Sequence, residues 1–147
     1  MPPHRPHPFE GSSFTVDLGT GTPTFFSRVE LPVATLDEVA YRSGADPANE
    51  THKQPGAAHY THLVLGRALT TDLAVWAWWE AARGGAPGVD RDVVVRLLDD
   101  THQPRLSWRF GNAFPAVYRV SPLDAGSAEA VVETVELAFD SMDAQAV

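Results

Sequence analysis

Alternation of apolar and polar residues is the first regular pattern along the chain, and it predicts β-strands. Phe14, Val16 and Leu18 alternate with polar residues, as in a strand with one buried face. Residues 19–23 are rich in turn formers, and residues 25–31 are again mostly apolar. The two apolar runs therefore predict a hairpin.

Two more strands are predicted in the middle of the chain, over residues 36–42 and 62–69. The stretch between them, residues 43–59, is polar and rich in glycine, proline and asparagine, so we expect a long loop there. Loops of this length inside a small domain usually serve a function of their own.

Residues 71–83 form the one clear helical pattern. Thr70 or Thr71 is a suitable N-cap, and a pair of glycines ends the helix. On such a helix Trp76 and Trp78 point about 160° apart, so one core cannot take both. We expect one face to pack on the sheet of the same domain and the other on a neighbouring subunit.

The clearest hairpin joins the alternating residues 92–98 to residues 105–110 across a polar turn. Asp99 and Asp100 lie in this turn, where aspartates act as hydrogen-bonding turn residues far more often than as catalytic carboxylates. A further short strand is predicted over residues 117–120.

Residues 128–142 fit two descriptions. Their content of alanine, glutamate and leucine favours a helix. Val131, Val135 and Leu137 also repeat with the period of a strand, with Glu133 as the exception to the apolar pattern. The residues alone leave helix and strand equally open.

Composition narrows the classes of function. The 147-residue chain has a formal net charge of −8, so it lacks the basic face that binding of duplex DNA requires. The absence of cysteine from the sequence excludes disulfides, thiol nucleophiles and cysteine-ligated metals. No apolar run is long enough to span a bilayer. Residues 1–12 are rich in proline and histidine and lack the apolar segment of a signal peptide, so we expect an extended arm and cytoplasmic synthesis.

No catalytic or cofactor motif is found in the sequence. It contains no nucleophile elbow, paired-histidine zinc helix, phosphate loop or calcium loop. His52, His59 and His62 are the one candidate set of metal ligands, but the last two point to opposite faces of a strand. We therefore expect no enzyme, no cofactor and no metal site. A small ligand- or metal-binding β-barrel is kept as a distant alternative.

Several motifs carry a resemblance to a known family. In chain order they are Val39-Ala-Tyr-Arg-Ser-Gly44, Lys53-Gln-Pro-Gly56, His62-Leu-Val-Leu-Gly-Arg-Ala-Leu-Thr-Thr71, Val95-Arg-Leu-Leu-Asp-Asp100, Leu106-Ser-Trp-Arg-Phe-Gly-Asn-Ala-Phe-Pro115, Ser121-Pro-Leu-Asp-Ala125 and Val132-Glu-Thr-Val-Glu-Leu137. Over about residues 14–142 they resemble the contractile phage tail tube protein family, the inner tube proteins of phage tails and of phage-tail-like contractile injection systems.

The resemblance implies a mainly β fold: a small antiparallel β-barrel or sandwich with one flanking α-helix over about residues 71–83. It implies an arm over residues 1–12, a tail-tube-like domain over residues 13–147, and a strand for the final segment. The implied function is a structural inner tube subunit, whose stacked hexameric rings conduct cargo and are driven through a target envelope by sheath contraction. A tube-initiator or baseplate adaptor ring of the same family is the alternative.

The implied partners are copies of the chain itself, a sheath protein, a baseplate or spike, and tape-measure or cargo proteins of the same particle. We expect no sequence-specific nucleic acid and no membrane anchor, and a place in a phage tail or phage tail-like particle after synthesis in the bacterial cytoplasm. The arm and the predicted loop are candidates for contact between rings. Candidate interface residues are Trp78, Lys53, Pro55, Gly56, His59, Tyr60, Asp99 and Asp100.

Overall fold

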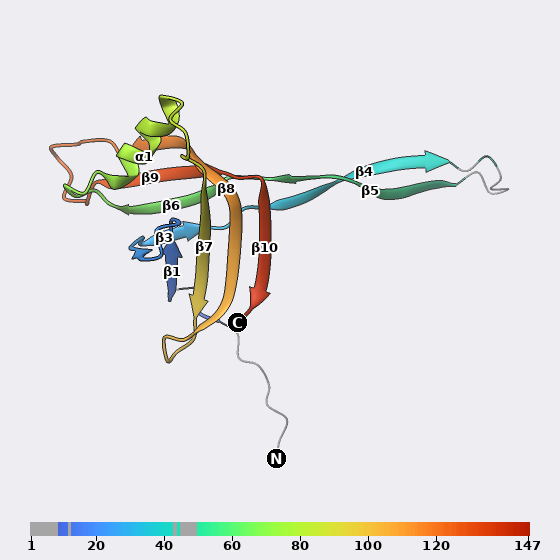
Figure 1. The fold of residues 1–147 in the computed structure, drawn as a ribbon, viewed down its shortest axis with the longest axis horizontal. Helices are drawn as coiled ribbons and strands as arrows, with labels where there is room; N and C mark the ends of the chain where they lie inside the picture. Colours follow the sequence, from blue (N-terminus) through green and yellow to red (C-terminus); the bar gives the residue numbers. More distant parts are fainter. Residues whose placement is uncertain (1–8, 12, 43, 45–49) are drawn as a thin grey trace, which may run out of the picture.

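The computed structural model describes residues 9–11, 13–42, 44 and 50–147. The expected arm over residues 1–12 therefore lies mostly outside the described residues. The elements, in chain order (Figure 1), are β1 (Phe14–Asp17), β2 (Pro23–Thr24), β3 (Arg28–Glu30), β4 (Ala34–Arg42), β5 (Thr51–Tyr60), β6 (Leu63–Ala68), α1 (Ala74–Arg83), β7 (Arg91–Leu98), β8 (Pro104–Val120), β9 (Val132–Ala138) and β10 (Ser141–Ala146).

One antiparallel sheet forms the body of the molecule, in the order β2-β1-β7-β8-β9-β6-β3, with β10 also paired to β8. The long strand β8 joins its two halves: residues 104–113 pair with β7 and residues 106–111 with β10, whereas residues 114–120 pair with β9. We call β2, β1, β7, β10 and the first part of β8 half-sheet A, and the rest of β8 with β9, β6 and β3 half-sheet B. The strand order runs from β2 to β3 without closing into a barrel.

The core lies between the two half-sheets and α1. Apolar residues at alternate positions of the strands are buried there, as the period of two predicts. The buried hydrophobic residues are Val16, Leu18, Phe26, Leu63, Leu65, Val75, Trp78, Val93, Val95, Phe110, Ala113, Val135 and Leu137. The mainly β fold with one helix is thus confirmed.

Helix α1 begins three residues later than predicted, with Leu73 at its N-cap position in place of Thr70 or Thr71, because the residues before it form a hydrogen-bonded turn. The side chain of Asp72 accepts a hydrogen bond from the backbone N–H of Ala74, and the hydroxyl of Thr70 accepts one from the N–H of Asp72. Gly85 follows the helix with a φ of 71°, a conformation that favours glycine at a helix end. Among the described residues, no helix is long and apolar enough to cross a membrane.

The predicted first hairpin is wrong, because none of residues 25–31 pairs with β1. Only the two residues of β2 pair with β1, whereas Arg28–Glu30 pair with β6 in the other half-sheet. Phe26 is buried in the core, and the N–H of Ser27 donates to the carbonyl of Gly66. Burying that phenylalanine carries the chain away from β1 to the opposite edge of the sheet.

The two strands predicted over residues 105–110 and 117–120 are one continuous strand, β8. Asn112 (φ 53°) and an irregularity after Pro115 bend this strand between the half-sheets. The final segment is a strand, β9, as the resemblance implied, and its buried positions alternate. β10 follows it and was not predicted, because its residues are mostly small and polar.

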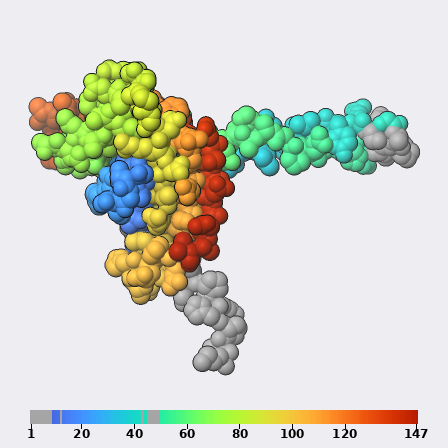
Figure 2. All heavy atoms as spheres, in the orientation of Figure 1, coloured from blue at the N-terminus to red at the C-terminus, as the bar shows by residue number. Residues whose placement is uncertain are grey.

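The predicted loop over residues 43–59 is wrong for its second part. Residues 51–60 form β5, which pairs with β4 from Arg42↔Thr51 to Ala34↔Tyr60. Figures 1 and 2 show this β4–β5 hairpin projecting away from the body of the molecule. All residues of strands β4 and β5 are exposed except the partly buried Gly56. A strand exposed on both faces needs no apolar alternation, so its sequence looks like a loop.

Candidate assembly interface

The β4–β5 hairpin has a β-bulge on the side of β5. Leu36 pairs with Ala58 and Glu38 with Pro55, which leaves two residues of β5 opposite the single Asp37. Gly56 occupies this bulge, where a Cβ atom would lie only 3.0 Å from the Cβ of Asp37 and 3.0 Å from the Cγ2 of Val39. Any larger residue would crowd these atoms, so glycine suits the close approach of the two strands here.

Polar side chains pair across the hairpin without stabilising it much. Nε2 of His59 lies 2.9 Å from Oδ2 of Asp37, and Nζ of Lys53 lies 3.2 Å from Oε2 of Glu38. All four side chains are more than half exposed. Exposed pairs of this kind contribute about 0–1 kcal/mol each, so they do not account for a hairpin that stands alone.

Apolar side chains are also exposed along the hairpin. Leu36 is 57% exposed, and Val39 and Tyr41 are exposed to similar degrees. The ring of Tyr41 lies 5.7 Å from that of His52. Burying an aliphatic or aromatic side chain contributes about 1.5–3 kcal/mol to the free energy of folding. These exposed side chains do not gain the whole of this contribution in the single chain. An isolated two-stranded hairpin is marginal in water, so this exposed hairpin is a candidate surface for contact with another chain.

The root of the hairpin is fixed to the body. The hydroxyl of Thr61 accepts a hydrogen bond from the N–H of Val33, and the N–H of Thr61 donates to the carbonyl of Val33. The ring of Tyr60 packs 5.5 Å from that of Phe139. Tyr60 therefore anchors the hairpin, while Lys53, Pro55 and Gly56 lie along its projecting part.

Asp99 organises the turn between β7 and β8. Its Oδ1 accepts hydrogen bonds from the backbone N–H groups of Thr101 and Gln103, and Nε of Arg105 donates to Oδ2 at 2.7 Å. The hydroxyl of Thr101 and these other donors hold the pKa of Asp99 well below its usual range. Asp100 is exposed beside it. Figure 1 shows this turn at the lower end of the body, far from the β4–β5 hairpin.

Trp78 lies inside the body. It is 3% exposed, its Nε1 donates to the carbonyl of Val89 at 2.8 Å, and the guanidinium of Arg91 lies 4.5 Å from its ring centre. The candidate interface residues thus occupy three separate places: the β4–β5 hairpin, the β7–β8 turn and the core. Of the three, the hairpin offers unused apolar surface.

Half-sheet A leaves an open strand edge at β10, a strand that the sequence did not predict. Residues 141–146 of β10 pair with β8 on one side and with no described strand on the other. At the opposite edge, β2 covers Val16 and Asp17 of β1 and leaves Phe14 and Thr15 open. Open edges of this kind pair readily with another chain. The alternation of Met142, Ala144 and Ala146 was the only signal for β10, and it is weak.

The face of half-sheet A that points away from the core is polar. Arg109 of β8 pairs with Asp92 of β7 at 2.7 Å and stands opposite Asp143 of β10. The hydrogen bond from Arg109 lowers the pKa of Asp92, and Asp92 in turn raises that of Arg109. This face carries both signs of charge and offers little to an apolar ligand.

The histidines proposed as an alternative metal set have other contacts. His59 pairs with Asp37, and Nδ1 of His62 lies 3.3 Å from Oε1 of Glu136. The ring of His52 lies beside Tyr41. Within the described part of the chain, no three histidine, aspartate or glutamate side chains gather as a metal site.

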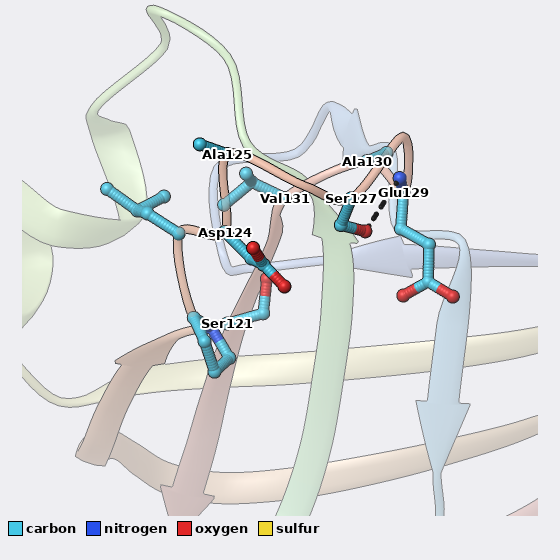
Figure 3. Close-up of a pocket in the computed structure, with 9 residues that line it drawn as sticks. Ser121, Asp124, Ala125, Ser127, Glu129, Ala130 and Val131 are labelled. Carbon is cyan, nitrogen blue, oxygen red and sulfur yellow. Dashed lines mark hydrogen bonds between the residues drawn. The ribbon is translucent and has the colours of Figure 1, made fainter.

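A shallow hollow lies on the surface at the loop between β8 and β9 (Figure 3). Its polar groups are used within the loop: Oδ1 of Asp124 accepts from the N–H of Gly126, and the hydroxyl of Ser127 accepts from the N–H of Glu129. Figure 3 shows the carboxylate of Glu129 directed away from Asp124. The hollow therefore lacks the converging polar groups that orient a small ligand.

Comparisons with known proteins agree with this geometry. The sequence matches the family described as T4-like virus tail tube protein gp19 over residues 11–143. No curated protein matches the sequence. The fold is similar to that of a chain in the anti-feeding prophage cap, the tube terminating cap, with a TM-score of 0.85 and 23% identity over 98% of this chain and 95% of that chain.

Two further solved structures contain chains of the same fold. A chain in the sheath–tube complex of PVC, an extracellular contractile injection system, in the extended state gives a TM-score of 0.83 and 24% identity, over 96% of this chain and 93% of that chain. A chain in the anti-feeding prophage baseplate gives a TM-score of 0.80 and 21% identity, over 96% of this chain and 97% of that chain. Each of these similar chains comes from a larger assembly.

Proposed function

The chain belongs to the T4-like virus tail tube protein family, and on that premise we propose that it is the inner tube subunit of a phage tail-like contractile injection system. Hexameric rings of the chain stack into a tube that conducts cargo, and contraction of a sheath drives the tube through a target envelope. Its partners are copies of itself, the sheath protein, the baseplate or spike, and tape-measure or cargo proteins. The particle is a phage tail or a phage tail-like device.

The exposed β4–β5 hairpin is the observation that carries this proposal. Leu36, Val39 and Tyr41 are exposed on strands that contact no other part of the described chain except at their root. A second copy of the chain supplies the missing cover, since a tube is built from identical subunits. Lys53, Pro55, Gly56 and His59 then lie at this contact between copies.

The open edges of half-sheet A suit the closure of a ring. β10 lies at one edge and β1 with β2 at the other, so β10 of one copy can extend the sheet of the next. A contact between two different surfaces of identical subunits forms a ring when the rotation closes. The core and α1 cover the other face of half-sheet A, so its polar face, with Arg109 and Asp143, lines the lumen of the ring.

A single ring of the same family, as a tube initiator, baseplate adaptor or cap, is the second candidate. The similarity to a chain of the anti-feeding prophage cap supports it. A tube subunit must bind copies both beside it and above it, whereas a single ring needs only the lateral contact. The length of the assembly formed by the purified chain separates the two.

Negative-stain electron microscopy and light scattering of the purified chain test the proposal. We expect rings that stack into long tubes. Replacing Leu36, Val39 and Tyr41 together by serine should leave a folded chain and reduce the mean tube length at least tenfold, because the hairpin loses its apolar contacts. Leu123→Ser is the matched control, since this leucine is 80% exposed in the β8–β9 loop and its replacement should leave the tubes unchanged.

Three results would overturn the proposal or part of it. A wild-type chain that stays monomeric at high concentration contradicts any assembly role. Wild-type rings that never stack contradict the inner tube role and support the single ring. Full-length tubes from the triple serine variant contradict the part assigned to the hairpin.

A further inference from the structure

Helix α1 and the neighbouring part of β8 carry a row of aromatic side chains that are only partly buried, of which Tyr118 of β8 also packs against the core. The rings of Trp76 and Trp79 stack with their centres 5.3 Å apart, and Trp76 meets Tyr118 edge-on at 5.2 Å. The guanidinium of Arg83 lies 5.1 Å from the ring centre of Trp79. All four residues remain partly or fully exposed. We call Tyr118, Trp76, Trp79 and Arg83 the α1 aromatic row.

The composition of this row is that of a binding surface. Tryptophan, tyrosine and arginine are the residue types that contribute most at protein–protein interfaces. Leu73, which is exposed at the start of the helix, adds apolar surface beside them. The contrast with Trp78 on the same helix is direct, because Trp78 is buried and its indole N–H is bonded to Val89.

The sequence contains one segment whose chemistry suits such a surface. Residues 1–8 hold four prolines and no acidic residue, and Arg5 is their only formal charge in a chain with a net charge of −8. Proline-rich segments favour the polyproline II conformation, which binds aromatic-lined surfaces at a small cost in entropy. The exposed carboxylate of Glu80, paired with Arg83 at 3.4 Å, supplies negative charge next to the row.

The described residue closest to β1 on its N-terminal side, Ser13, lies at the end of half-sheet A away from α1. The carbonyl of Ser13 accepts a hydrogen bond from the N–H of Leu98, at the end of β7. The helix lies at the other end of β7, where Arg91 covers Trp78. Eight strand residues span about 26 Å, so β1 begins at the end of half-sheet A opposite to α1 (Figure 1).

A copy stacked head to tail brings its α1 to the end of half-sheet A at which β1 begins. Residues 1–12 in a polyproline II conformation span about 37 Å, which is enough to cross a contact between two subunits. Such a contact does not close on itself, so it repeats along an open stack. We propose that residues 1–8 of one copy bind the α1 aromatic row of the copy stacked next to it. This inference rests on the stacking of rings in the proposed function.

Deletion of residues 2–8 tests the segment without touching a described element. We expect rings of normal size and a loss of long tubes, with mean tube length reduced at least tenfold. Replacing Pro2, Pro3, Pro6 and Pro8 together by serine should have the same effect at unchanged length and charge. Leu123→Ser, in the exposed β8–β9 loop, again serves as the surface control and should leave the tubes unchanged.

The outcomes separate this inference from the proposed function. Full-length tubes from the deletion variant overturn the inference and leave the inner tube role intact. Loss of rings together with tubes also overturns it, because the segment then acts within a ring. A wild-type chain that forms no tubes contradicts the proposed function itself.

A peptide of residues 1–12 locates the binding surface. Added to ¹⁵N-labelled chain lacking residues 2–8, kept dilute enough to be monomeric, it should shift the indole N–H signals of Trp76 and Trp79. The signals of Trp78 and Trp108 should stay in place. In the control, a peptide in which serine replaces each proline should shift none of the four indole signals. No shift of the Trp76 and Trp79 signals overturns the inference.

The same signals distinguish a second copy from the chain's own segment. If the full chain, diluted to a monomer, already shows the indole positions of the peptide complex, the segment binds its own α1 and the proposed contact between copies is wrong. If the monomer shows the positions of the deletion variant, and these move only when tubes form, the contact between copies is supported.

Discussion

The body sheet and the β4–β5 hairpin are built from the same kind of antiparallel pairing, yet they bury very different amounts of surface. In the body, thirteen hydrophobic residues are buried between two half-sheets and α1. In the hairpin, none is buried, and Leu36, Val39 and Tyr41 are exposed. Strand pairing alone is therefore no measure of stability. The body buries its apolar residues within one chain, whereas the apolar residues of β4 and β5 stay exposed in the single chain.

Ion pairs show the same difference between the two regions. In the body, Arg67 and Glu133 face each other across β6 and β9, almost completely buried, with NH2 of Arg67 3.6 Å from Oε1 of Glu133. In the hairpin, Lys53 and Glu38 are about 70% exposed. Removing one partner of a buried pair leaves a charge without compensation, whereas an exposed charge is solvated by water.

The largest expected effect comes from Trp78→Ala. Removing this buried indole and its hydrogen bond to Val89 should lower the free energy of unfolding by about 3–5 kcal/mol, measured by urea denaturation of the dilute monomer. Leu36→Ala in the hairpin is the control and should change it by less than about 0.5 kcal/mol. Similar losses in both variants would contradict the division into body and hairpin.

The position of Trp78 also changes what a charge there would do. From the sequence, Trp78 is a candidate for the interface between subunits, and Trp78→Asp is expected to give a folded monomer that does not assemble. In the structure its side chain is part of the core. We now expect Trp78→Asp to unfold the chain, and the outer tryptophans, Trp76 and Trp79, to carry contacts with other copies.

The next largest effect is expected from Arg67→Met. Without the guanidinium, the buried carboxylate of Glu133 has no opposite charge within the core, and the loss at neutral pH should be about 3 kcal/mol. Burial already raises the pKa of Glu133, and Arg67 lowers it only in part. In the variant, Glu133 therefore binds a proton in the folded chain at pH values between its ordinary pKa and its raised pKa, where the unfolded chain has already lost that proton.

The sign of the pH dependence follows from this proton. Stability of the variant should fall as pH rises from the ordinary glutamate pKa, about 4.3, through the raised pKa of the folded state. The difference from wild type should thus be smaller at pH 5 than at pH 7, in paired urea titrations. The double variant Arg67→Met, Glu133→Gln removes the titrating group and should lose this dependence. A pH-independent loss in the single variant would show that Glu133 is not the cause.

Strands with one buried face and a clear alternation could be predicted from the sequence, whereas β5, exposed on both faces, and β10, whose residues are small and polar, could not. The alternation at Val93 and Val95, and at Phe14 and Val16, marked β7 and β1 because each strand has one buried face. β5 was taken for a loop because neither of its faces is buried, and Gly56 looked like a turn residue although it fits a bulge between strands.

At the final segment and at helix α1, packing against other strands decides what the local sequence pattern leaves open. Helix propensity competed with strand periodicity over residues 128–142, and pairing of β9 with both β6 and β8 decided for the strand. Glu133 seemed an exception to that periodicity, yet it is buried opposite Arg67. The separation of Trp76 from Trp78 around the helix was predictable, but which of them enters the core was not, because it depends on where the sheet lies.

The smallest effect is expected from the exposed pair in the hairpin, and it completes the contrast with the buried pair. Lys53→Met and Glu38→Gln, separately and together, form a double-mutant cycle on the free energy of unfolding of the monomer. Their coupling should be less than about 0.5 kcal/mol, because both side chains are solvated and the pair is screened by salt. A coupling above about 1 kcal/mol would mean that the hairpin stabilises the single chain as the body does. In that case its exposed surface would need no partner, and the argument for assembly through the hairpin would fail.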